Sequence, residues 1–118
     1  DFLSEANVAT GKVESFANGK ASLALGDAHF DIEVESAKVG EAKIALRPDV
    51  FEVTTDPNVS PALNATVTKC AFIGKGVEMM VNTAAGELFV FLPKEKIVRA
   101  IGSTVCLAFP ANEARLIV

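Results

Sequence analysis

Hydrophobic and polar residues alternate along most of this chain. Residues 20–25 (KASLAL), 29–34 (HFDIEV) and 77–82 (VEMMVN) place apolar side chains at every second position, and turn residues follow each run. A period of two is typical of strands that bury one face. The pattern predicts ten short strands, at 13–16, 20–25, 28–34, 42–46, 51–53, 63–73, 77–82, 87–92, 103–109 and 114–118.

Turn and helix signals refine this picture. Asn18 and Gly19 lie between the first two predicted strands and both accept a positive φ, which indicates an antiparallel hairpin. Pro93 precedes and Gly102 follows the one segment that favours a helix. We therefore expect at most one short helix, near 94–101, in an all-β chain.

The second half of the chain repeats the spacing of the first half. Gly40 is followed eight positions later by Pro48, and Gly102 eight positions later by Pro110, with an apolar strand between them each time. A polar stretch with two prolines separates the halves. We predict a single region, 1–118, made of repeat one at 7–54, a linker at 55–62 and repeat two at 63–118. Each repeat is too small to bury its own sheet, so the two should share a barrel-like core.

Composition narrows the function classes. The 118 residues carry a formal charge of −4, half of them are hydrophobic, and the chain has no Trp or Tyr. A nucleic-acid partner is therefore not expected, because such sites need basic grooves with exposed aromatic residues. No apolar stretch is long enough for a membrane span, and we expect a cytosolic location. The chain begins without Met, so we expect it to be part of a longer polypeptide.

No pattern in the sequence indicates a catalytic centre or a metal site. His29 is the only histidine and alternates with apolar neighbours, so we expect a solvent-facing strand residue. The acidic residues around it, at 27, 31, 33 and 35, are interpreted as a solvated strand face. Gly74-Lys75-Gly76 lacks the longer run of a phosphate-binding loop and predicts a hairpin turn. The two cysteines, at 70 and 106, lack metal-site spacing and are expected to be buried, reduced thiols.

The tripeptide Arg47-Pro48-Asp49 is the candidate site. It ends an apolar strand with a charged pair and a fixed φ. A guanidinium at this point can hold Asp49 or a nearby carbonyl. We predict a structural corner, with an inter-domain or inter-subunit contact or a small anion bound by Arg47 as the alternatives.

Four segments of the chain carry a family resemblance: residues 1–7 (DFLSEAN), 40–49 (GEAKIALRPD), 67–74 (VTKCAFIG) and 102–110 (GSTVCLAFP). The second resembles a "G-x-x-V-x-L-A-I-R-P-E" signature, the third a "V-x-x-x-x-F-L-G" strand and the fourth the closing strand of the same family, while the first resembles the junction that follows a nucleotide-binding domain. Together they resemble the C-terminal regulatory region, or TOBE domain, of the ATP-binding subunits of bacterial ABC importers. Ser4 and Asp49 replace the usual Gly and Glu of the family.

The resemblance implies an OB-like barrel in an importer of the maltose, iron(III), polyamine or sulfate class. It implies a non-catalytic domain that pairs with its twin as a homodimer and holds two ATPase subunits together. ATP and Mg²⁺ would be bound by the nucleotide-binding domain of the parent chain. The permease subunits would place the protein at the cytoplasmic side of the inner membrane. The alternative function is a free-standing cytosolic oxyanion sensor of the molybdate-binding type.

Overall fold

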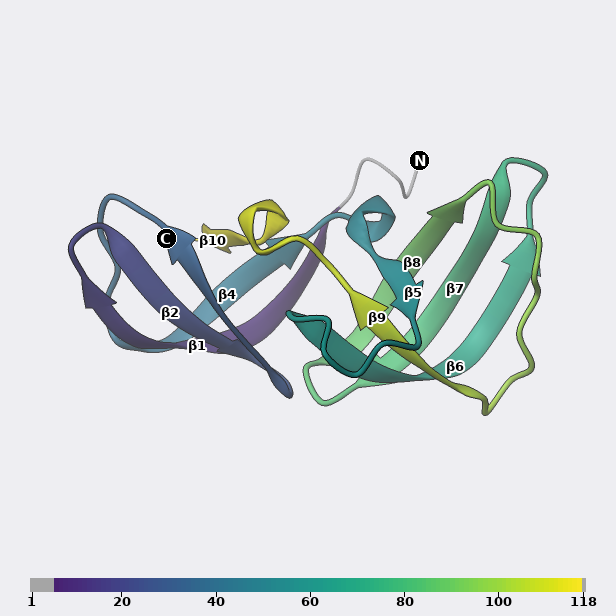
Figure 1. Ribbon diagram of the computed structural model, residues 1–118, viewed down its shortest axis with the longest axis horizontal. Coiled ribbons are helices and arrows are strands. Elements are labelled where there is room, and N and C mark those ends of the chain that lie inside the picture. The colour runs from purple at the N-terminus through teal and green to yellow at the C-terminus, as the bar shows by residue number, and fades with distance from the viewer. Residues whose placement is uncertain (1–5, 118) are drawn as a thin grey trace.

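Ten strands form two curled five-stranded sheets in the computed structural model, which describes residues 6–117 (Figure 1). Sheet A has the strand order β10-β4-β1-β2-β3, and sheet B has the order β5-β9-β6-β7-β8. All strand pairs are antiparallel. The strands are β1 (Asn7–Ala17), β2 (Lys20–Leu25), β3 (Ala28–Glu33), β4 (Gly40–Leu46), β5 (Glu52–Thr54), β6 (Ala62–Phe72), β7 (Gly76–Thr83), β8 (Gly86–Pro93), β9 (Thr104–Ala108) and β10 (Arg115–Ile117).

The two sheets exchange one strand with each other. Sheet B repeats the strand arrangement of sheet A. The strands β6, β7, β8 and β9 take the places of β1, β2, β3 and β4, and β5 takes the place of β10. The last strand of the first half, β5, pairs with β9, and the last strand of the chain, β10, pairs with β4. Short 3-10 helices, η2 (Pro48–Val50) and η3 (Ala111–Glu113), precede both exchanged strands. The all-β, OB-like fold predicted from the sequence is confirmed, whereas the repeat and linker boundaries stay a prediction.

Local sequence explains the hairpins. Asn18 and Gly19 both have positive φ, of 53° and 76°, as a two-residue turn matched to strand twist requires. Each half has a register shift in its first hairpin, between Val13 and Ser15 in β1 and between Val67 and Lys69 in β6. Such bulges bend a strand and increase its twist, which helps a sheet to curl.

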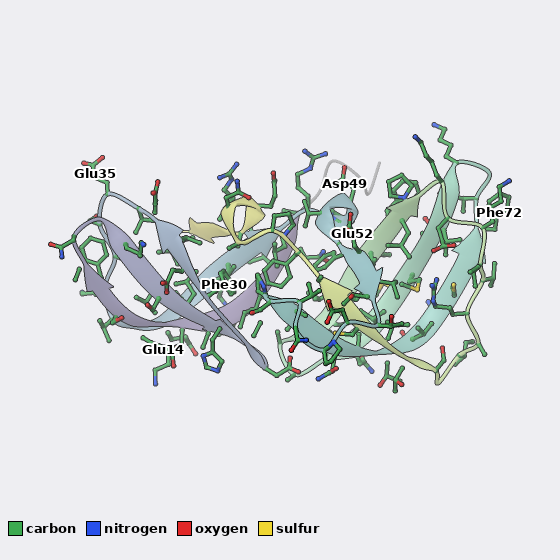
Figure 2. The ribbon with its side chains drawn as sticks, in the orientation of Figure 1. Glu14, Phe30, Glu35, Asp49, Glu52 and Phe72 are labelled. Carbon is green, nitrogen blue, oxygen red and sulfur yellow. The ribbon has the colours of Figure 1, made fainter. Side chains whose placement is uncertain are left out.

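One continuous hydrophobic core joins the sheets. Phe109, which follows β9, packs edge-to-face on Phe30 of β3, with ring centroids 5.3 Å apart, and also on Phe51, at 5.9 Å. Figure 2 shows Phe30 in the middle of the molecule, between the two sheets. Edge-to-face pairs add roughly 0.5–1.5 kcal/mol beyond the area they bury. The repeats therefore share their interior, as the small size of each half leads one to expect.

The segment near 94–101, where the sequence predicts at most one short helix, forms no helix. Residues 94–102, here called the strap, run beside β6 without regular secondary structure. Lys94 has a φ of 67°, which interrupts a right-handed helix at its first residue. The strap instead places its backbone against β6, where the Gly102 N–H donates to the Val67 carbonyl at 2.7 Å. Across residues 6–117, no helix has the length and apolar character needed to cross a bilayer.

Candidate functional site

The Arg47 corner carries the chain from sheet A to sheet B. Arg47 is extended (φ −67°, ψ 147°), and Pro48 is buried at the start of η2. The Arg47 Nη2 donates to Asp49 Oδ2 at 2.9 Å, so the sequence-predicted pair does form. The two side chains are 61% and 31% exposed, which makes this a surface ion pair. A contact between this corner and another subunit stays a prediction.

Asp49 also faces an open seam between the edges of sheet B. Its Oδ1 is buried and has no hydrogen-bond partner among the described residues. A groove of about 500 Å³ lies between β5 and the end of β8, and its charged lining residues are Asp49, Glu52, Glu95 and Lys94. This groove has three carboxylates and one ammonium group, so its electrostatics oppose the binding of an anion.

The corresponding seam of sheet A has the same character. A groove of about 620 Å³ lies between β3 and β10, and its charged lining residues are Asp31, Glu33 and Arg115. Carboxylates again outnumber cations. Neither seam resembles an oxyanion site, which would converge cationic groups or backbone N–H groups on the ligand.

Asn7 fastens the start of sheet A to the edge of sheet B. Its Nδ2 donates to the Phe89 carbonyl and its Oδ1 accepts from the Phe89 N–H, both at 2.8 Å. The side-chain amide therefore pairs with the edge strand β8 as a peptide group of a neighbouring strand would. The sequence places Asn7 at the start of repeat one and in the family junction, but it predicts no contact for this side chain. Residues 1–5 of that junction lie outside the described part of the chain.

Two hairpin turns meet at the centre of the molecule. Gly26 lies in the β2–β3 turn, where an added Cβ would be 2.9 Å from the backbone nitrogen of Ala85 in the β7–β8 turn. Next to it, Asp27 Oδ2 accepts a 2.7 Å hydrogen bond from Asn64 Nδ2. The Asp27–Asn64 and Asn7–Phe89 hydrogen bonds join residues 37 and 82 positions apart. No local pattern contains such pairs, and sequence reasoning missed them.

His29 has the role expected of a surface residue. Its side chain is 65% exposed, and its Nδ1 lies 3.0 Å from Glu14 Oε1. Asp31, on the same strand, accepts a 2.7 Å hydrogen bond from Ser22. Among residues 6–117, no three His, Cys, Asp or Glu side chains gather as metal ligands would. The prediction of a solvent-facing strand histidine is confirmed.

The remaining sequence candidates also have structural positions. Gly74-Lys75-Gly76 forms the end of the β6–β7 hairpin, as predicted. The two methionines of β7 differ in burial, since Met79 is in the core and Met80 is half-buried. The expectation of buried cysteines is wrong in degree: both thiols are unbridged but only partly buried. Cys70 is reached by the strap, whose Arg99 N–H donates to its Sγ at 3.2 Å.

Comparisons with known proteins identify the family of this chain. The TOBE domain model matches residues 44–117. The chain is 31% identical over 117 residues to the "Fe(3+) ions import ATP-binding protein FbpC 1" of Rhizobium meliloti (strain 1021), covering 99% of this chain and 33% of the relative. It is 32% identical over 93 residues to the FbpC protein of Brucella abortus (strain 2308), covering 79% of this chain and 26% of the relative.

A solved structure supports the fold assignment. The crystal structure of the cytoplasmic molybdate-binding protein ModG with molybdate bound superposes with a TM-score of 0.71 at 17% identity, covering 97% of this chain and 96% of that chain. At this identity the likeness concerns the fold alone. The chain spans about a quarter to a third of the length of the curated relatives. On the strength of the family match over residues 44–117, the chain belongs to the TOBE domain family, as the sequence resemblance indicated.

Proposed function

We propose that this domain is the dimerising regulatory part of an ABC importer ATP-binding subunit. The observation that carries the proposal is the match of nearly the whole chain to iron(III) importer ATP-binding proteins, joined to the TOBE family match. A regulatory module needs a stable body and a partner surface rather than a reactive group. Tethering two ATPase domains at one end raises their effective concentration for each other.

The other parts of the proposal follow from the same relatives. ATP and Mg²⁺ bind to a nucleotide-binding domain elsewhere in the parent chain, and this domain holds no cofactor and hydrolyses no ATP. The parent subunit works at the cytoplasmic face of the inner membrane, where it contacts permease subunits and no nucleic acid. The proposed partner of the domain itself is a second copy in a homodimer.

Deletion of the domain tests this proposal. We expect the full-length parent chain to sediment as a dimer at micromolar concentration without ATP, and the chain lacking residues 7–117 to sediment as a monomer. The protein that lacks residues 7–117 should keep its ATP-binding site. Its monomers should associate only at higher protein concentration. A full-length chain that stays monomeric at high concentration contradicts the proposal.

An oxyanion sensor is the second candidate, favoured only by the fold shared with ModG. The carboxylates in both seam grooves weigh against it. Calorimetric titration of the parent chain with molybdate, sulfate and phosphate separates the two functions. Micromolar binding of any of the three would favour the sensor.

A further inference from the structure

Strand β3 lies at the edge of sheet A, and part of its backbone faces the groove beside β10. It pairs only with β2. The Val34 N–H donates to the Gly19 carbonyl at 2.9 Å, and hydrogen-bonded residues alternate along an antiparallel pair. The residues bonded to β2 are therefore 28, 30, 32 and 34. The N–H and C=O groups of Asp31 and Glu33 point the other way, and both residues line the groove of about 620 Å³.

The equivalent edge of sheet B shows what such a backbone can bind. Each edge strand begins after a two-residue turn, with Ala28 in β3 and Gly86 in β8, so Asp31 corresponds to Phe89. The N–H and C=O groups of Phe89 bond to the side-chain amide of Asn7, both at 2.8 Å. Among the described residues, none pairs with the backbone of Asp31 on its groove side. One edge therefore binds an amide group, and the matching edge is open.

The topology of sheet A determines the direction of a strand that would fill the groove. Five strands paired antiparallel throughout give β3 and β10 the same direction. These two edges could pair with each other only in parallel, which is slightly less stable per residue. One added strand of the opposite direction would be antiparallel to both edges and would cover their free backbone groups.

The side chains of β3 determine the pattern of a sequence that fits. Ile32 is buried, whereas Asp31 and Glu33 are exposed on the other face. Side chains of paired strands lie beside each other on the same face of a sheet. An added strand should therefore alternate between apolar side chains, which would contact Ile32 and the half-buried Leu116 across the groove, and polar side chains on the outer face.

The charges around the groove favour basic residues at the polar positions. Neither Asp31 nor Glu33 forms an ion pair within the described part of the chain. Lys20 lies opposite Glu33 on the inner strand β2 and does not line the groove. Arg115, on the far wall, donates to the Asn112 carbonyl at 3.2 Å. A strand beside β3 thus meets two carboxylates first, and opposite charges across a strand pair are stabilising.

We propose that the edge of β3 binds an extended segment of another protein, antiparallel to β3, in which apolar residues alternate with Lys or Arg. Backbone hydrogen bonds to Asp31 and Glu33 supply the pairing, and the alternating side chains supply the selectivity. A dimer of the parent chain formed through any other surface leaves this edge available.

Synthetic peptides test the pairing on the full-length parent chain. The probe is a capped hexapeptide of alternating Lys and Val. One control has Glu in place of Lys, and the other has Pro in place of the central Val, because Pro lacks the N–H that strand pairing needs. We expect calorimetry to show that the Lys/Val probe binds about tenfold more tightly than either control. NMR should show slower amide exchange at Asp31 and Glu33 when the probe is bound.

A substitution in the chain tests the charge preference. Glu33→Gln removes one carboxylate from the edge and should weaken binding of the probe about twofold to fivefold, because a cross-strand ion pair is lost. Glu41→Gln is the matched control, since Glu41 is also an exposed carboxylate of sheet A but lies opposite Lys12 on β1. It should leave the affinity unchanged.

The outcomes distinguish this edge from the proposed function. A parent chain that does not bind the Lys/Val probe at millimolar concentration overturns the proposed site. Equal binding of the Pro control would mean that charge alone attracts the probe, and slower exchange confined to β8 would place the probe on the other sheet, so either result also overturns it. A parent chain that binds the probe at β3 but never dimerises removes the proposed function and leaves the site in place.

Discussion

The Arg47 side chain reaches Asp49 from a position that is 61% exposed to solvent. Exposed ion pairs contribute about 0–1 kcal/mol, because water and salt screen them. We therefore expect Arg47→Ala to lower the free energy of unfolding by less than about 1 kcal/mol, as measured by urea denaturation. Phe109→Ala is the contrast, since it removes a buried ring and should cost about 3–5 kcal/mol. A loss of similar size for Arg47→Ala would contradict the surface role.

Asn7 permits a sharper test at a single side chain. Asn7→Ala removes both hydrogen bonds to Phe89 and should cost about 1 kcal/mol or more, with faster amide exchange at Phe89. Asn7→Asp keeps the acceptor but sets a carboxylate oxygen against the Phe89 carbonyl. We expect Asp to be as harmful as Ala at pH 7 and to recover as the pH falls toward about 4, where a protonated carboxyl can donate. An Asp variant without this recovery would contradict the pairing.

Only the local part of the candidate site could be predicted from the sequence. Arg47 and Asp49 are two positions apart, and Pro48 fixes the backbone between them, so their pairing follows from spacing. Asn7 meets Phe89 across 82 residues, and this contact exists only once both sheets have formed. Alternation of hydrophobic and polar residues says which face of a strand is buried, but not which distant edge an amide will reach.

At the scale of elements, the meeting of two turns at Gly26 predicts a steric effect. Gly26→Ala adds a Cβ close to Ala85 in the opposite turn, and its φ of 57° adds backbone strain. Gly19→Ala is the matched control, because Gly19 also lies in a hairpin turn with positive φ (76°), but its nearest neighbour is 3.8 Å away. We expect Gly26→Ala to cost about 1–3 kcal/mol more than Gly19→Ala in thermal unfolding. Equal costs would show that the turns do not press on each other.

The strap contains a carboxylate that makes its order depend on pH. The Ile97 N–H, at 3.2 Å from Glu95 Oε2, is the main cause that lowers the pKa of Glu95 below its ordinary value of 4.5, with Lys96 N–H and Arg99 also contributing. A lowered pKa in the folded state means that the carboxylate stabilises the strap above pH 4.5 and loses this effect as the pH falls through the lowered value. Amide exchange of Ile97 should therefore quicken in acid, and Glu95→Gln should abolish this pH dependence.

The strap also shows where element prediction from sequence stops. Pro93 and Gly102 are genuine helix-boundary signals, and alternation located the ten strands because half-buried strands leave a period of two. The strap lies beside β6, however. Its Lys94 and Gly102 N–H groups donate to carbonyls of the β6–β7 turn and of β6, and only isolated turns form within the segment. Tertiary pairing of this kind overrides a weak local preference in a segment only two turns long.

At the scale of the whole molecule, the exchange of β5 and β10 makes each half depend on the other. Repeat one alone would lack β10 on the edge of β4, and repeat two alone would lack β5 on the edge of β9. Each would also expose its side of the shared core around Phe30 and Phe109. We therefore expect the domain to unfold in one cooperative transition, with matching van't Hoff and calorimetric enthalpies.

A chain cut within the linker tests this dependence directly. Residues 1–58 and 59–118, produced separately, should each lack the dispersed amide signals of a folded sheet, because neither can bury its apolar face alone. Mixing them should restore the two-sheet spectrum, since β5 and β10 can pair across the cut. Two halves that fold independently would instead make each repeat a domain, and the exchanged strands would then be accessory to stability rather than required for it.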